Sequence, residues 1–112
     1  MRRKERRNDA RHPVGWLAEY SAEGIAGTWS RCEVIDISEA GAGLILEGPP
    51  VETDTRLTLE LAADHSRLEG TVRHVTMSPD GTMHIGVEFS PDSAALVVLK
   101  ITNELATILT AV

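Results

Sequence analysis

The sequence is poor in the residues on which several classes of protein depend. Its 112 residues include one cysteine, Cys32, which cannot close an internal disulfide or build the usual multi-thiolate zinc site. No apolar run approaches the roughly 20 residues that a membrane-spanning helix needs. Aromatic residues make up 4% of the chain, which disfavours the stacking surfaces of a single-stranded nucleic-acid-binding protein. These residues are Trp16, Tyr20, Trp29 and Phe89.

Motifs of the common enzyme classes are also absent. The chain has no Gly-x-Ser-x-Gly element, no phosphate-binding P-loop and no dinucleotide fingerprint. The histidines His12, His65, His74 and His84 lack the spacing of a metal site, although His74 and His84 could face each other across a hairpin. No apolar stretch follows the basic N-terminus before Pro13, so we expect no secretory signal. We therefore predict a cytoplasmic protein with no catalytic residues, no metal site and no cofactor.

Charge is distributed unevenly along the chain. The formal net charge is −6, yet residues 1–11 carry six basic and two acidic groups, which gives them +4 and the remainder −10. An acidic body lacks the extended basic face on which duplex nucleic acid is bound, so nucleic-acid binding is not expected. A basic arm can still bind a small anion, or it can be a solvated tail. Charge alone does not decide between these two interpretations.

Short strands are predicted between residues 14 and 89. Leu57, Leu59 and Leu61 recur with a strict period of two, which places them on one face of a strand. Residues 78–81 (Ser-Pro-Asp-Gly) have the composition of a tight turn, because proline presets φ and glycine accepts a positive φ. Connections this short favour antiparallel pairing and closure into a small barrel. The six predicted strands fall within residues 14–20, 29–37, 44–46, 56–62, 68–76 and 84–89.

The C-terminal segment changes to a helical period. Ser90 can cap a helix, with Pro91 at its first position and Asp92 near the positive end of its dipole. Apolar residues then recur at spacings of four and three, which predicts one buried face. That face consists of Ala94, Val98, Ile101, Leu105 and Ile108, with Leu96, Leu99 and Ala106 to its side.

These patterns together predict a mainly β fold, a six-stranded antiparallel β-barrel with a C-terminal α-helix over residues 91–110. Residues 1–13 are predicted to form a flexible basic arm, and residues 14–112 the barrel domain with its helix. A helix that is apolar on more than one side either covers the barrel mouth deeply or contacts a second subunit, so a homodimer stays open.

Three arginines, Arg6, Arg7 and Arg11, stand directly before the first predicted strand. Guanidinium groups offer rigid donor forks that suit phosphate oxygens and the O6/N7 edge of guanine, and they stack on purines. Arg7 and Arg11 are four residues apart, so a turn or a wrap could bring both to one ligand. Asp9 lies between them, where its carboxylate could oppose a phosphate or orient an arginine.

A second polar stretch, residues 36–41 (Asp-Ile-Ser-Glu-Ala-Gly), stands at the end of the second predicted strand. In a strand, Asp36 and Ser38 point to the same side, and Gly41 permits a tight turn and a close approach of a ligand. A carboxylate can accept the N1–H and N2–H₂ groups of guanine, and a hydroxyl can bind phosphate or base. The alternative is a turn in which Asp36 and Ser38 bond their own backbone.

The two stretches together resemble the signature of the PilZ family, an Arg-x-x-x-Arg arm before the first strand and an Asp/Asn-x-Ser-x-x-Gly element one hairpin later. Here the elements are residues 7–11, preceded by Arg6, and residues 36–41. Residues 68–72 (Leu-Glu-Gly-Thr-Val) and 85–89 (Ile-Gly-Val-Glu-Phe) resemble the late strands of the family. The resemblance covers nearly the whole chain and implies a six-stranded barrel followed by a helix, in agreement with the periodicity.

The resemblance also implies a function, that of a stand-alone bacterial receptor for cyclic di-GMP. Such a receptor relays the level of this second messenger to a partner protein or to a second copy of itself. The alternative is a nucleotide-independent adaptor that binds a motility, secretion or polysaccharide-synthesis protein through its barrel or helix. The implied ligand-binding residues are Arg6, Arg7 and Arg11 of the arm and Asp36, Ser38 and Gly41 of the second stretch.

Overall fold

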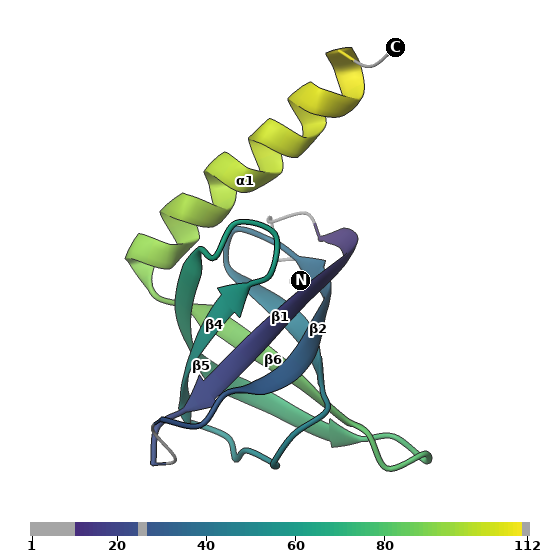
Figure 1. Ribbon diagram of the computed structural model, residues 1–112, viewed down its shortest axis with the longest axis vertical. Helices are drawn as coiled ribbons and strands as arrows, with labels where there is room; N and C mark the ends of the chain where they lie inside the picture. The colour runs from purple at the N-terminus through teal and green to yellow at the C-terminus, as the bar shows by residue number, and fades with distance from the viewer. Residues whose placement is uncertain (1–10, 25–26, 111–112) are drawn as a thin grey trace, which may run out of the picture.

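A computed structural model describes residues 11–24 and 27–110, with side chains as far as residue 102 in the final helix. Six strands close into an antiparallel barrel in the order β1-β2-β3-β6-β5-β4, and one helix crosses an end of the barrel and projects beyond it (Figure 1). This confirms the predicted six-stranded barrel with a C-terminal helix. The elements are β1 (His12–Ala22), β2 (Ser30–Ile37), β3 (Gly41–Leu46), β4 (Arg56–Leu61), β5 (Arg67–Met77), β6 (Met83–Phe89) and α1 (Pro91–Thr110).

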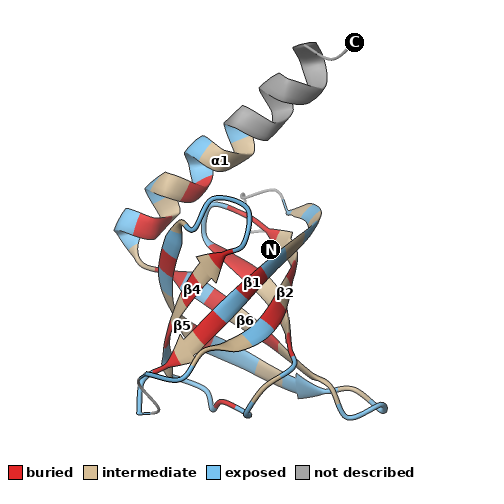
Figure 2. Ribbon diagram, in the orientation of Figure 1, coloured by how far each residue is buried: buried red, intermediate tan, exposed pale blue. Residues whose placement is uncertain are grey.

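Alternation of apolar and polar side chains builds the core, as the change of colour along the strands in Figure 2 shows. Leu57, Leu59 and Leu61 are all buried inside the barrel, because successive side chains of a strand point to opposite faces. Burial of each leucine contributes roughly 1.5–3 kcal/mol. Tyr20, also fully buried, donates its hydroxyl proton to the carbonyl oxygen of Pro49 at 2.6 Å, which satisfies its polar end.

The register of β1 brings the start of the described chain to the end of β2. His12 lies opposite Ile37, and Pro13 lies opposite Asp36. Residues 12 and 13 therefore belong to the first strand, while residues 1–10 of the predicted arm lie outside the described residues. Arg11, the last arginine of the arm, stands beside the second polar stretch.

Side-chain contacts fix the first turns of α1 on the barrel. The N–H of Ser93 donates to the hydroxyl oxygen of the capping residue Ser90 at 3.3 Å. The Ser93 hydroxyl oxygen in turn accepts the N–H of Glu69 on β5 at 2.7 Å. Farther along α1, Lys100 forms an ion pair with Asp64 in the connection between β4 and β5. The contact of Ser93 with β5 and the ion pair of Lys100 with Asp64 set the rotation of the helix on the barrel.

The predicted buried face of α1 is wrong at Val98. Val97 is fully buried, whereas Val98 is 40% exposed and Leu99 is 61% exposed. Ile101 packs partly against the core, as predicted. The contact of Ser93 with β5 turns that side of the helix toward the barrel. Val97 is four positions later and therefore lies on the same side of the helix, facing the core.

The side chains of Leu105 and Ile108, both placed on the predicted face, lie outside the described residues. Over residues 11–24 and 27–110, no helix combines the length and apolar character that crossing a membrane requires.

Candidate functional site

Arg11 and Asp36 meet on the outside of the barrel, where β1 begins and β2 ends. Nη1 of Arg11 donates to Oδ1 of Asp36 at 2.5 Å, with side chains that are 43% and 32% exposed. The same Oδ1 accepts the backbone N–H of Gly43 on β3 at 3.0 Å. The carboxylate is thus oriented from two strands, and its exposed part can still accept donors from a ligand. A surface ion pair contributes about 0–1 kcal/mol, so a ligand with better partners can rearrange it.

Gly43 provides the space in which the Asp36 carboxylate lies. A Cβ atom at Gly43 would come within 3.1 Å of both carboxylate oxygens of Asp36. Such a side chain would push the carboxylate away from the Gly43 N–H that orients it. Gly43 therefore helps to position Asp36 in the candidate site, although it lies outside the predicted motif.

Ser38 and Gly41 close the turn between β2 and β3. Ser38 is 1% exposed, and its hydroxyl oxygen accepts the N–H groups of Ala40 at 3.3 Å and Gly41 at 3.2 Å. A Cβ at Gly41 would lie 2.1 Å from the carbonyl oxygen of Val87, so glycine alone fits beside β6. The turn interpretation therefore accounts for Ser38. Asp36 instead bonds Arg11 and β3, and its half-buried side chain reaches the surface where Ser38 is fully buried, so the two residues do not share a surface.

The same turn is bonded to the strand that leads into α1. The N–H of Phe89 donates to the carbonyl oxygen of Ala40 at 2.9 Å, and Gly41 is paired with Glu88. Phe89 directly precedes Ser90, the capping residue of α1. A displacement of the turn would therefore act on the root of the helix through one layer of backbone hydrogen bonds.

The predicted site residues fall into three groups in the structure. Arg11 and Asp36 contact each other, and Ser38 and Gly41 form the adjacent turn. Arg6 and Arg7 lie outside the described residues. Whether these residues bind a ligand stays a prediction.

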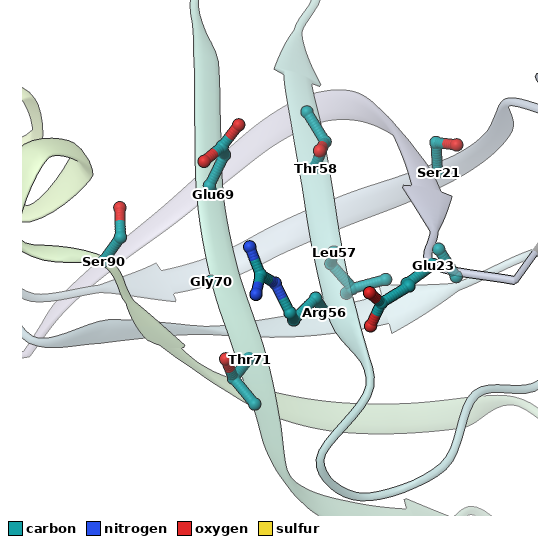
Figure 3. Close-up of a pocket in the computed structure, with 10 residues that line it drawn as sticks. Ser21, Glu23, Arg56, Leu57, Thr58, Glu69, Gly70, Thr71 and Ser90 are labelled. Carbon is teal, nitrogen blue, oxygen red and sulfur yellow. The ribbon is translucent and has the colours of Figure 1, made fainter. Parts of the chain in front are cut away.

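A hollow of about 380 Å³ lies on another part of the barrel, over β1, β4 and β5 (Figure 3). The guanidinium group of Arg56 projects into it, with the carboxylates of Glu23 and Glu69 nearby and the hydroxyls of Thr58 and Thr71 along its wall. The lining carries both signs of charge, and no residue of the two predicted motifs belongs to it.

The described side chains offer no metal centre. Over residues 11–24 and 27–102, no three His, Cys, Asp or Glu side chains gather in a way that could hold a metal ion. Cys32, the single thiol, is buried in the core. The polar surface around Arg11 and Asp36 consists of a guanidinium group, a carboxylate and the backbone of Gly43.

The model of the PilZ domain family matches residues 2–103 of the chain. The match spans both polar stretches, all six strands and residues 91–103 of α1. The chain therefore belongs to the PilZ family, as the motifs predicted. No curated protein sequence shows a significant match to it.

Solved structures of PilZ proteins share the fold. The PilZ domain of Escherichia coli YcgR with c-di-GMP superposes with a TM-score of 0.66 at 14% identity and covers 96% of this chain and 100% of its own. The Bacillus subtilis inhibitor of motility, MotI/DgrA, gives 0.62 at 22% identity, over 95% of this chain and 55% of its own. The K. pneumoniae MrkH–c-di-GMP complex gives 0.64 at 18% identity, over 92% and 55%. The chain thus spans about half the length of MotI/DgrA and MrkH.

Proposed function

We propose that the chain is a cytoplasmic receptor for cyclic di-GMP that relays the level of this second messenger to a partner protein. The observation that carries the proposal is the contact of Arg11 with Asp36, which joins the two motifs of the family on one surface. The YcgR domain and MrkH, which share this fold, are both described in complex with c-di-GMP. Their identity to this chain is low, so the chemistry of its own residues has to support the same ligand.

The surface around Asp36 suits the two chemical parts of the ligand. The carboxylate can accept the N1–H and N2–H₂ donors of a guanine edge, a pairing that few other groups offer. The guanidinium group of Arg11 can keep or give up its contact with the Asp36 carboxylate while it binds a phosphate or the O6/N7 edge of guanine. We expect Arg6 and Arg7 to complete the phosphate contacts from the arm.

The energetics favour binding by several arginines together. Each charge-assisted hydrogen bond contributes roughly 1.5–3 kcal/mol. Ordering a segment on binding costs roughly 2–5 kcal/mol. Two contacts barely offset this cost, while four leave a clear surplus. Loss of a single arginine can therefore remove most of the affinity.

The relay to a partner follows from the position of the turn. Ser38 and Gly41 hold the turn beside the ligand surface, and Ala40 bonds Phe89 at the root of α1. A ligand that shifts this turn would change how α1 leaves the barrel. Exposed apolar side chains on α1, Val98 and Leu99, support a contact with another protein or with a second copy of the chain.

The same exposed residues favour a second candidate function, a nucleotide-independent adaptor. An adaptor needs an apolar surface for its partner, and it does not require a bound nucleotide. Val98 and Leu99 supply such a surface whether or not the arginines bind a ligand. The two functions differ in one observable, the response of the Arg11–Asp36 surface to the nucleotide.

The test is a map of backbone amide shifts of the ¹⁵N-labelled chain during titration with cyclic di-GMP. We expect the largest changes at Gly43, Gly41 and Phe89, because these amides orient Asp36, form the turn or join it to α1. The amides of Ser21 and Thr58, in the hollow of Figure 3, serve as the control and stay in place. Changes confined to the hollow, or none at saturating nucleotide, would overturn the proposal. A complete lack of change would favour the adaptor function over the receptor function.

A further inference from the structure

The hairpin of β5 and β6 extends past its neighbouring strands and projects from the barrel (Figure 1). β4 pairs with β5 as far as Thr71, and the last backbone bonds on that side join Val72 to Asp54 and Thr55. Within the described part of the chain, no strand pairs with residues 73–77 on the side away from β6. A closed barrel otherwise removes the edges of its sheet, so this stretch is a free edge.

The register of the hairpin corrects one expectation from the sequence. His84 is paired with Thr76, and His74 is paired with Gly86, so the two histidines do not face each other. The expectation that they could is wrong because the turn pairs Met77 with Met83, which sets every later pair of the hairpin.

The backbone of the free edge presents hydrogen-bonding groups to solvent. The N–H of Ser78 donates across the hairpin to β6 at 2.8 Å, and Thr76 lies opposite His84. Hydrogen-bonded and non-hydrogen-bonded pairs alternate along an antiparallel ladder. Thr76 therefore bonds β6, while the N–H and C=O groups of Val75 and Met77 point away from it. These groups are a template for one further strand.

The free edge is complementary to a copy of itself under a two-fold axis. With the axis beside Thr76, two antiparallel copies of β5 place Val75 of one copy opposite Met77 of the other. Each such pair exchanges both of its backbone hydrogen bonds, so every free group of the two residues finds a partner. The two Thr76 side chains then lie side by side, a cross-strand pair that stabilises sheets.

Charge and apolar surface favour a second copy as the strand that binds there. The register places Pro79 of the second copy opposite Arg73, and its neighbour Asp80 thus brings a carboxylate to the guanidinium group. Met77, 58% exposed in the single chain, gains a contact with Val75 of the second copy. The free edge contains neither lysine nor proline, the residues that commonly block such pairing.

We propose that two copies of the chain pair through this free edge, β5 against β5, and form a symmetric dimer with one continuous sheet. The inference goes beyond the proposed function and does not rest on nucleotide binding. The contact involves one short stretch of strand from each copy. Small interfaces of this kind belong to weak and reversible complexes, so the dimer exchanges with the single chain.

Disulfide trapping tests the position of the axis. Thr76→Cys sets two thiols opposite each other at a Cα separation of about 4.5 Å, that of a non-hydrogen-bonded pair, which a disulfide can span. With oxidised glutathione, this variant should form a covalent dimer far faster than His74→Cys. His74 is a matched control, because it is exposed on the same strand and the register places it opposite Ser78 of the second copy. Cys32 is buried in both variants.

Sedimentation velocity tests the interface without an added thiol. The unmodified chain should show a dimer whose share grows with concentration. Met77→Pro removes an N–H that faces the free edge and leaves the bonds to β6, so it should raise the dissociation constant roughly 5- to 150-fold, the loss of one hydrogen bond from each half. Met77→Leu keeps the N–H and should associate like the unmodified chain. A melting curve of each variant checks that the barrel is intact.

Three results would overturn the dimer. One is an unmodified chain that stays single at every concentration. Another is a Met77→Pro chain that associates as tightly as Met77→Leu, which would assign the contact to a different surface. The third is a rate of covalent linkage in Thr76→Cys no greater than that in His74→Cys.

Discussion

Arg11 and Asp36, 25 residues apart in the sequence, meet at 2.5 Å between Nη1 and Oδ1. The contact follows from the pairing of Pro13 with Asp36, which brings the end of the arginine arm to the end of β2. Two short motifs that are weak when taken singly thus become one surface with a guanidinium group, a carboxylate and the backbone of Gly43.

Replacement of single arginines should separate specific contacts from general charge. Arg7→Ala and Arg11→Ala should each abolish most binding of cyclic di-GMP, with a melting temperature close to that of the unmodified chain. The small effect on stability is expected because an exposed ion pair contributes about 0–1 kcal/mol. Arg2→Ala and Arg3→Ala, outside the motif, serve as matched controls and should retain binding in the same titration. Equal losses from all four would show that the arm acts as diffuse positive charge.

Asp36 should affect both binding and stability, by different amounts. Asp36→Ala should weaken binding by about 1–3 kcal/mol, roughly 5- to 150-fold, because the guanine edge loses its acceptor. It should also lower the free energy of unfolding by about 1 kcal/mol, since the Gly43 N–H loses its partner. Asp36→Asn keeps a carbonyl oxygen for Gly43 and should recover stability more than affinity. A destabilised Asp36→Ala chain with unmodified affinity would assign Asp36 to the fold alone.

Ser38 and Gly41 should matter chiefly for folding. Ser38→Ala removes the oxygen that accepts two N–H groups and should cost about 1–3 kcal/mol of stability in urea denaturation. Gly41→Ala should cost more, because its Cβ would lie 2.1 Å from the Val87 carbonyl oxygen. Gly15→Ala is the control, since a Cβ there would meet only Glu33 Oε2 at 3.6 Å. A Gly41→Ala chain as stable as Gly15→Ala would contradict the close approach of β3 and β6.

Cys32 should be unreactive in the folded protein. Burial, with smaller effects of the carboxylates of Glu47 and Glu19, raises the pKa of its thiol to about 12. Because the folded pKa exceeds the unfolded one of about 8.5, this group contributes stability below that pH and loses it as pH rises toward 12. Iodoacetamide at pH 8 should therefore label the folded chain far more slowly than the urea-unfolded chain. Equal labelling rates would contradict burial of Cys32.

The barrel was predictable because apolar side chains alternate with a period of two in the strands that line its core. Leu57, Leu59 and Leu61 alternate without interruption, and proline and glycine mark the turn at residues 78–81. The rotation of α1 was not predictable from its own sequence. It depends on the bond between Ser93 and Glu69, which joins residues 24 positions apart and turns Val97 inward in place of Val98.

The candidate site was predictable as two motifs and not as a surface. Arg11 and Asp36 were chosen for their chemistry, whereas their contact depends on the register of β1 on β2. The position of Asp36 on the outside of the barrel was not predictable, because strict alternation assigns a residue two positions after the buried Val34 to the interior. A shift of register between Val34 and Asp36 reverses that assignment, and no local sequence signal marks it.

The most direct test of the receptor is the heat released when cyclic di-GMP is titrated into the unmodified chain, with GTP and cyclic AMP as parallel controls. The account predicts saturable binding of cyclic di-GMP with a dissociation constant in the micromolar range or tighter, and no heat from either control. Absence of heat and of any thermal shift at saturating cyclic di-GMP would contradict it.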